Sequence, residues 1–144
     1  MNEKDVFDLQ GFLPYILNQA AERASLEFQT YYKSRYGMLR TEWRVLFHLG
    51  RYGRMQAKEI CQRARIHKTK VSRAVSALEH KRLLSRTDLP EDRRGEYLML
   101  TTRGGQVFGD LCQEAQRFDA NMLRDFTLEE QTVLRRVLIK LAQF

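Results

Sequence analysis

The sequence has few of the features that mark secreted or membrane-spanning proteins. Its 144 residues include two cysteines, Cys61 and Cys112, which cannot form a disulfide framework. No apolar run approaches the roughly 20 residues that a membrane-spanning helix needs. Residues Met1–Asp5 lack the basic start and apolar stretch of a secretory signal. We therefore expect a protein of the reducing cytoplasm, without a disulfide framework and without a membrane partner.

The motifs of common catalytic and metal sites are also missing. The histidines His48, His67 and His80 show no metal-ligand spacing to cysteines or carboxylates. No nucleophile elbow, P-loop or dinucleotide-binding glycine pattern occurs, and Gly104-Gly105 is typical of a helix start. We expect no enzyme, no bound metal and no cofactor.

The positive charge is confined to the middle of the chain. Of the net charge of +7, residues 51–103 carry fourteen Lys and Arg against six Asp and Glu, whereas the flanks are close to neutral. Ten of the fourteen are arginines, which suit phosphate oxygens better than mere solubility requires. Such a block on a neutral scaffold indicates a polyanionic partner such as nucleic acid, although a solvated basic face is the alternative.

Hydrophobic spacing predicts six helices and one hairpin in a single domain. The helices are expected at about 12–36, 42–49, 57–64, 69–81, 102–124 and 128–143, and the strands at 84–86 and 97–100. The third and fourth helices form the pattern of a helix-turn-helix, and the charged hairpin after them is a wing. The predicted fold is mainly α with a small β-hairpin wing: a winged helix-turn-helix flanked by N- and C-terminal dimerisation helices.

Capping residues set the expected helix ends. Pro14 falls in the first turn of the first helix and Gly37 ends that helix. Thr41 is expected to cap the second helix, which Gly50 and Gly53 close. A capping box, Thr127-Leu128-Glu129-Glu130, opens the last helix.

The first helix and the last two carry more apolar surface than a small winged unit can cover. The last helix alone places five aliphatic residues on one stripe: Val133, Leu134, Val137, Leu138 and Leu141. A second copy of the chain would bury this surplus, and a two-fold dimer is the commonest way to do so. A compact monomer is the alternative.

The fourth helix separates a polar stripe from an apolar one. When Val71, Val75 and Leu78 point to the core, the opposite side carries Thr69, Arg73, Ser76 and His80, with Ser72 beside them. An arginine can bind O6 and N7 of guanine, and small hydroxyls can bind bases or phosphates. Lys68 and Lys70 stand at the helix start, where the dipole favours phosphate. An ordinary solvated face would more often carry Glu and Lys.

The wing adds further basic residues. Arg86, Arg93 and Arg94 lie on the hairpin, and an arginine at a hairpin tip can enter a narrow minor groove. Asp92 can brace one of them through a charge-assisted hydrogen bond. A solvated turn with incidental charges is the alternative.

These motifs resemble those of a known family. Residues Asp92–Thr101 match the D-x-R-x-x-x-L-x-L-T wing signature of MarR-type transcriptional regulators. Lys68–Val75 and Leu78-Glu79 resemble the recognition helix of that family, and Glu42–Leu46 resembles the start of its second helix. Relatives often have a capping Ser or Thr where this chain has Gln56, and commonly a glycine where it has Arg82.

The resemblance covers nearly the whole chain and implies one domain over residues 1–144. It places the winged helix-turn-helix at about 38–101 and dimerisation helices at about 9–36 and 102–144. It implies a homodimer on a pseudo-palindromic duplex operator, usually a repressor released by a small ligand or by oxidation. By position, Thr69, Ser72, Arg73 and Ser76 would read the major groove, and Arg94, oriented by Asp92, would reach the minor groove.

Aromatic residues indicate where a ligand would bind. Ten of the fifteen lie within residues 1–52, and the family's ligands lodge between the dimerisation helices and the winged unit. A planar aromatic acid suits such a cleft, with an arginine on the carboxylate. Glu42-Trp43-Arg44 also resembles relatives that control the catabolism of aromatic acids or their thioesters, which implies the thioester as a further ligand. The candidates are Tyr15, Tyr36, Arg40, Trp43, Arg44 and Phe47. Packing in the core or dimer interface is the alternative for each ring.

Two other hypotheses stay open. A redox switch would use Cys61 or Cys112, yet both fall on apolar helix faces and are predicted to be small core residues. Arg63 and Arg65 lie near Cys61 in the sequence and could stabilise its thiolate, so this alternative stays open. A protein that binds DNA without sequence preference would use the same basic block, with a steep salt dependence and little discrimination.

Overall fold

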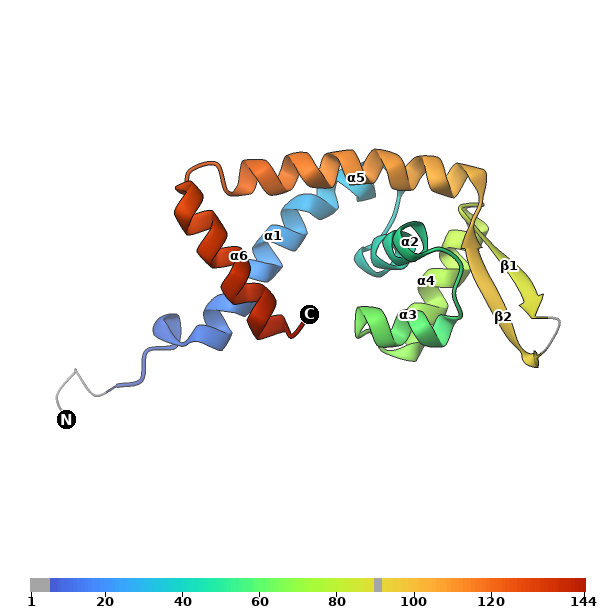
Figure 1. Ribbon diagram of the computed structural model, residues 1–144, viewed down its shortest axis with the longest axis horizontal. Coiled ribbons are helices and arrows are strands. Elements are labelled where there is room, and N and C mark those ends of the chain that lie inside the picture. Colours follow the sequence, from blue (N-terminus) through green and yellow to red (C-terminus); the bar gives the residue numbers. More distant parts are fainter. Residues whose placement is uncertain (1–5, 90–91) are drawn as a thin grey trace. The chain divides into compact units, whose positions relative to one another are not determined.

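The computed structural model describes residues 6–89 and 92–144, except for the side chains of Leu89 and of residues 92–94. The chain divides after Phe108 into two compact units. Over the described residues the secondary structure comprises six α-helices, one short 3-10 helix and one antiparallel hairpin (Figure 1). The predicted fold class is confirmed: the protein is mainly helical, with a two-stranded wing.

The first helix follows the sequence prediction closely. A 3-10 turn, η2 (Leu9–Gly11), precedes α1 (Leu13–Tyr36), which has Pro14 in its first turn and ends at Gly37. Gly37 has φ 64°, a left-handed conformation that glycine adopts without the steric cost of a Cβ atom. The 3-10 turn was not predicted.

The second helix is longer than predicted. α2 runs from Arg40 to Tyr52, so Thr41 lies inside its first turn and the prediction of a Thr41 cap is wrong. The carboxylate of Glu42 instead accepts a hydrogen bond from the backbone N–H of Leu39, the residue before the helix. Gly50 continues the helix, and Gly53 alone ends it.

The third and fourth helices form the predicted helix-turn-helix. α3 (Ala57–Ala64) and α4 (Lys68–His80) pack against each other and are joined by three residues. Arg65 begins this turn with φ 53°, where many such turns use glycine. The Nδ1 atom of His67 accepts the backbone N–H of Thr69 at 3.2 Å and caps α4, a role that the sequence analysis did not predict.

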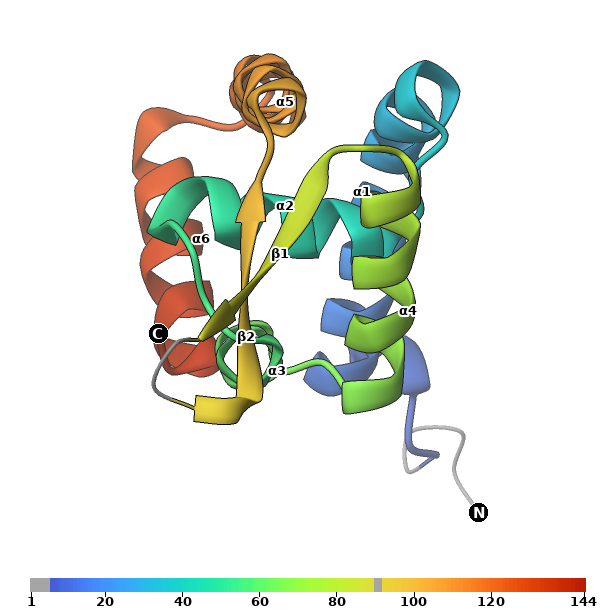
Figure 2. The same cartoon turned by 90° about the vertical axis from the view of Figure 1, so that its right-hand side faces the viewer.

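The wing is longer than the short strands that the sequence predicts. β1 (Leu84–Leu89) pairs with β2 (Asp92–Leu100), with Leu84 opposite Leu100 and Arg86 opposite Leu98 (Figure 2). Met55 and Leu98 exchange two backbone hydrogen bonds of 3.1 and 2.9 Å, which tie the wing to the segment before α3. These bonds give the hairpin a fixed attachment to the helical core.

The core of the first unit forms where α2, α3, α4 and the wing meet. Its fully buried side chains include Tyr32, Met38, Val45, Leu46, Met55, Ile60, Val71, Leu78 and Leu98. On α4 the buried positions are Val71, Ala74, Val75 and Leu78, as the hydrophobic spacing predicts. Apolar packing therefore holds the buried side of α4 against α2, α3 and β1.

In the second unit, residues 109–144, the end of α5 (Thr102–Met122) leads into α6 (Leu128–Ala142). The predicted capping box is confirmed, because Thr127 and Glu130 exchange hydrogen bonds of 3.1 Å. The Arg135 guanidinium pairs with Asp119 at 2.8 Å. The aliphatic stripe of α6 is exposed in the single chain: Val133, Leu134, Val137, Leu138 and Leu141. In the described part of the chain, no helix is long and apolar enough to cross a membrane.

Candidate nucleic-acid interface

One face of α4 is free of the core and carries small polar and basic side chains. Thr69, Ser72, Arg73, Ser76 and His80 are all exposed, whereas the opposite face packs on α2, α3 and β1. Because serine and threonine are short, a groove edge can approach this face closely. The structure therefore brings together the residues that the sequence analysis assigned to base reading.

The start of α4 presents positive charge at the N-terminal end of the helix. Lys68 and Lys70 are both exposed in the first turn, whose N–H groups and helix dipole already favour an anion. Since the ring of His67 accepts the N–H of Thr69, the first turn is fixed in place. This end of the helix has the chemistry of a phosphate contact.

The wing arginines fall into two groups. Arg93 and Arg94 belong to β2 at the far end of the hairpin, and their side chains, like that of Asp92, lie outside the described residues. Arg86 lies in β1 next to α4, where its side chain is well described. The predicted brace between Asp92 and an arginine therefore stays a prediction.

Arg86 contacts carboxylates of both the helix and the wing. Its Nε atom donates to Glu79 Oε2 at 3.0 Å, and its Nη1 atom donates to Glu96 Oε1 at 2.6 Å. Its Nη2 atom reaches Ser76 Oγ at 3.5 Å. The hydrogen bond to Glu96 is the main reason why the pKa of the Arg86 guanidinium lies above its ordinary value.

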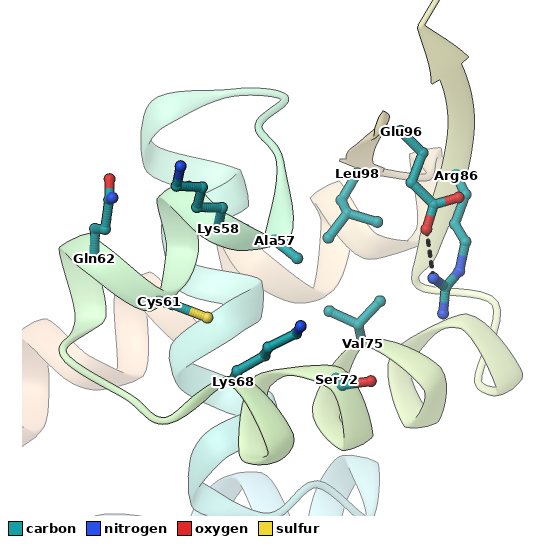
Figure 3. A pocket seen from close by; sticks show the side chains of 10 residues that line it. All are labelled: Ala57, Lys58, Cys61, Gln62, Lys68, Ser72, Val75, Arg86, Glu96 and Leu98. Carbon is teal, nitrogen blue, oxygen red and sulfur yellow. Dashed lines mark hydrogen bonds and ion pairs between the residues drawn. The ribbon is translucent and has the colours of Figure 1, made fainter. Parts of the chain in front are cut away.

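A cleft of about 530 Å³ opens between α3, α4 and the wing (Figure 3). Its walls include Lys58 and Cys61 from α3, Lys68 and Ser72 from α4, and Arg86 with Glu96 from the wing. In Figure 3 the sulfur atom of Cys61 points into the cleft, and the Arg86–Glu96 pair stands at the end nearest the strands. The cleft therefore lies among the proposed DNA-contacting elements.

An aromatic cluster joins α1 to α2. Trp43 stacks on Tyr32 with ring centroids 5.7 Å apart, meets Phe28 edge-on at 5.3 Å, and contacts Phe47 at 5.6 Å. The indole Nε1 of Trp43 is buried, and no described residue accepts its hydrogen bond. A buried donor without an acceptor is costly, so this N–H would bind any polar atom that reached it.

The two candidate arginines of α2 already have partners. Arg40 forms a two-pronged pair with Glu22 of α1 at 3.3 and 3.2 Å. Arg44 donates to the backbone carbonyl of Ala64 at 2.7 Å, and burial lowers the pKa of its guanidinium below the ordinary value. Arg40 would have to give up Glu22 before forming a two-pronged pair with a ligand carboxylate, whereas the hydrogen bond of Arg44 to Ala64 uses Nη2 alone.

The candidate tyrosines do not converge in one chain. Tyr15 and Tyr36 lie near opposite ends of α1, about 31 Å apart at the rise of an α-helix. Tyr36 is near the Trp43 end of the helix, and Tyr15 is far from it. One small ligand in a single protomer can contact only one of the two.

Neither cysteine is a fully buried core residue, so the prediction for both is wrong. Cys61 and Cys112 are half-buried free thiols, and Cys61 faces the cleft. Burial raises the pKa of Cys112, which lowers its thiolate fraction. The apolar helix pattern showed the side on which each cysteine lies but not how deeply it is buried.

Comparison with known proteins identifies the architecture. The profile of the MarR family matches residues 36–95. The chain is 25% identical over 126 residues to the uncharacterised HTH-type transcriptional regulator YwaE of Bacillus subtilis, covering 88% of this chain and 74% of that protein. The MarR/EmrR family transcriptional regulator of Acinetobacter sp. ADP1 is similar in structure, with a TM-score of 0.83, 25% identity, and coverage of 95% of this chain and 96% of that one.

A third similar protein matches almost the full length of this chain. BpsR of Bordetella bronchiseptica, whose DNA binding is regulated by 6-hydroxynicotinic acid, superposes with a TM-score of 0.84. The identity is 17%, and the match covers 96% of this chain and 99% of that one. Residues 36–95, the DNA-binding part of the chain, therefore match the MarR family, whose members are winged helix-turn-helix transcriptional regulators that bind DNA as homodimers and are not enzymes.

Two departures from the MarR pattern have visible consequences. Gln56 precedes α3 but makes no side-chain capping hydrogen bond in the described structure. Arg82, where MarR relatives commonly have glycine, adopts φ 61°. Both residues therefore occupy positions where the family's usual residue would suit the backbone better.

Sequence reasoning missed several residues that position this MarR interface. His67 caps α4, Glu79 and Glu96 hold Arg86, and Lys81 pairs with the buried Glu42. Among the described residues, no group of three or more His, Cys, Asp or Glu side chains has the arrangement of a metal site. Only the local motif before α4 could have indicated His67, since each of the other pairs joins residues of different secondary-structure elements or of the segments beside them.

Proposed function

We propose that this MarR-family regulator is a cytoplasmic, homodimeric, sequence-specific repressor that a small ligand releases from its operator. The observation that carries the proposal is the division of α4. Its apolar side is buried, and its exposed side presents Thr69, Ser72, Arg73 and Ser76 on one stripe. These residue types make hydrogen bonds to base edges, with arginine favouring guanine.

The proposed DNA contacts divide between two grooves. Thr69, Ser72, Arg73 and Ser76 read the major groove, while Lys68 and Lys70 bind phosphates at the start of α4. Arg94 enters the minor groove with Asp92 orienting it, and Arg93 contacts the backbone beside it.

The proposed dimer uses the helices outside the winged part. Residues at about 9–36 and 102–144 form the dimerisation region, and residues at about 38–101 form the DNA-binding part. Support comes from the exposed aliphatic stripe of α6 and from exposed apolar side chains near the N-terminal end, among them Phe7, Leu13 and Ile16. A second copy would cover such surfaces, and two recognition helices match the two half-sites of an inverted repeat.

The proposed effector is a planar aromatic acid or its thioester that binds beside the Trp43 cluster. The unpartnered Nε1 of Trp43 offers a donor, and Phe47 and Tyr36 offer ring faces nearby. Arg40 or Arg44 would meet the carboxylate, and Tyr15 would take part only as a residue of the second chain. That BpsR responds to 6-hydroxynicotinic acid is consistent with this ligand class.

The effector is testable by fluorescence, because Trp43 is the single tryptophan of the chain. Titration with a panel of benzoates, hydroxybenzoates, nicotinates and their thioesters should quench or shift its emission for a compound that binds. The same compound should lower operator affinity. A panel that changes neither the emission nor the affinity would overturn the choice of ligand class.

The DNA-binding proposal is tested by selection of sheared genomic DNA with the purified protein at physiological salt, followed by sequencing. We expect a few enriched fragments that share an inverted repeat, with half-site centres roughly 10 bp apart. Equal recovery of all fragments would contradict sequence specificity and favour a general DNA-binding protein.

A further inference from the structure

Arg86 uses all three nitrogen atoms of its guanidinium within the protein. Nε binds Glu79 on α4, Nη1 binds Glu96 on β2, and Nη2 contacts Ser76 on α4. Arg86 itself belongs to β1. One side chain therefore links the recognition helix to both strands of the wing.

The charge at this point is opposite to that of the surrounding basic block. Two carboxylates flank one guanidinium, so the cluster of Glu79, Arg86 and Glu96 carries a net charge of −1. A phosphate approaching Arg86 would have to displace a carboxylate at 2.6 or 3.0 Å and would face the second one. Arg86 is thus a poor phosphate ligand, in contrast to Lys68 and Lys70 at the start of α4.

The strand register points Arg86 toward the helices. Arg86 lies opposite Leu98, and Asp88 lies opposite Glu96, so all four side chains share one face of the hairpin. Leu98 on that face is buried. Figure 3 shows the Arg86–Glu96 pair on the same side of the cleft as Leu98, bridging toward α4.

We propose that Arg86 is a positioning residue that fixes the wing at a set distance from α4, and that it does not itself bind the DNA backbone. This inference rests on the proposed function, because the distance matters only if α4 and the wing contact one duplex together. We call the contacts of Arg86 with Glu79, Glu96 and Ser76 the Arg86 brace. When this brace is formed, Arg94 at the wing tip can enter the minor groove while Arg73 occupies the major groove. The contact to Ser76 also restrains a hydroxyl of the base-reading stripe.

Salt dependence distinguishes a brace from a phosphate ligand. The probe is the duplex most enriched by wild-type protein from a randomised 30-bp library, with its dissociation constant measured from 50 to 300 mM KCl. A phosphate ligand contributes about 0.9 to the slope of log K against log salt. We expect Arg86→Ala to lower affinity about fivefold or more without changing the slope. Lys68→Ala, the control, should reduce the slope by about 1.8, because the homodimer loses one phosphate contact in each half-site.

Lysine substitution gives a second distinction. Lysine can replace arginine as a point charge on phosphate, but it cannot bind two carboxylates and a hydroxyl in the planar geometry of a guanidinium. Arg86→Lys should therefore bind the probe as poorly as Arg86→Ala. An Arg86→Lys variant that binds like wild type would overturn the proposal.

The carboxylates complete the test. In a Glu79→Gln, Glu96→Gln background the loss caused by Arg86→Ala should shrink to less than about twofold, because the brace is already weakened. A loss that stays at its full size, or a slope that falls by about 1.8 for Arg86→Ala, would overturn the proposal and assign Arg86 to the DNA backbone.

The Arg86 brace can also be tested without DNA. Such a test distinguishes a wrong inference about Arg86 from a wrong proposal about DNA binding. Hydrogen exchange of the β1 amides in the free dimer should be about fivefold faster in both Arg86→Ala and Arg86→Lys, with α1 unchanged. Unchanged exchange in β1 would overturn the inference even if the wild type selects an operator. Faster exchange in β1, with no sequence selected by the wild type, would support the brace and reject sequence-specific regulation.

Discussion

Glu42 and Lys81 form a largely buried ion pair between the first turn of α2 and the end of α4. Lys81 Nζ lies 2.7 Å from Glu42 Oε1, and the Glu42 side chain is 5% exposed. The other carboxylate oxygen, Oε2, accepts the backbone N–H of Leu39. A single carboxylate therefore holds the start of α2, next to Trp43, to the residue that follows the recognition helix.

The first prediction concerns the two halves of this pair. Lys81→Met leaves a buried carboxylate without its cation, whereas Glu42→Gln leaves a lysine whose side chain is 30% exposed and can reach water. We expect Lys81→Met to cost about 3 kcal/mol of unfolding free energy and Glu42→Gln distinctly less. Urea unfolding followed by Trp43 fluorescence, at one fixed protein concentration, measures both. Equal losses would show that the pair is not buried as described.

The second prediction uses the left-handed backbone at Arg82. A non-glycine residue with φ 61° bears a steric cost that glycine avoids. Arg82→Gly should therefore stabilise the fold, by about 0.5–1 kcal/mol after the greater chain entropy of unfolded glycine is counted.

The matched control is Gly37, which has φ 64° and open space where a Cβ would stand. Gly37→Ala should destabilise by about 1 kcal/mol, since only the backbone conformation opposes it. Thermal unfolding of both variants checks the pair. A destabilising Arg82→Gly would mean that the arginine side chain contributes more than its backbone costs.

The third prediction separates two adjacent glycines at the start of α5. A Cβ on Gly104 would lie 2.0 Å from the backbone oxygen of Leu83, whereas a Cβ on Gly105 would meet nothing within 4 Å. Gly104→Ala should cost at least about 2 kcal/mol, because backbone must move. Gly105→Ala should stabilise by about 0.5 kcal/mol through helix propensity. Chemical denaturation measures the unfolding free energy of both variants. Equal changes in that free energy would contradict the prediction.

The fourth prediction addresses the redox alternative through Cys112. Burial raises the pKa of this thiol, so at pH 8 less of it is thiolate than in an exposed cysteine. In a Cys61→Ser variant, Cys112 should react with Ellman's reagent more slowly than a model thiol, with a rate profile displaced to higher pH. Reaction at pH 7 faster than the model thiol would instead indicate a stabilised thiolate and a redox-responsive site.

Features that repeat at short spacing were predictable from the sequence. The division of α4 into a buried side, with Val71 and Leu78, and an exposed side, with Arg73 and Ser76, follows from 3.6-residue periodicity alone. The capping box of Thr127 and Glu130 is likewise a local motif, and the structure confirms it.

Features that depend on distant residues were not predictable. Glu42 and Lys81 are 39 positions apart, and no local pattern links them. Thr41 was expected to cap α2 because threonine favours that position, but the carboxylate of Glu42 reaches back to Leu39 and the helix starts one residue before Thr41. Arg86 was predicted as a DNA ligand from its charge, since the sequence could not show that two glutamates surround it in space.

The central claim is that the exposed stripe of α4 reads base edges, and Arg73→Ala tests it most directly. Dissociation constants are measured for the selected operator and for a random duplex of equal length at the same salt, with Arg23→Ala on α1 as the control. Wild type and Arg23→Ala should favour the operator by at least about a thousandfold. Arg73→Ala should lose about 1–3 kcal/mol on the operator and much less on the random duplex. An equal loss on both duplexes would contradict base reading by Arg73.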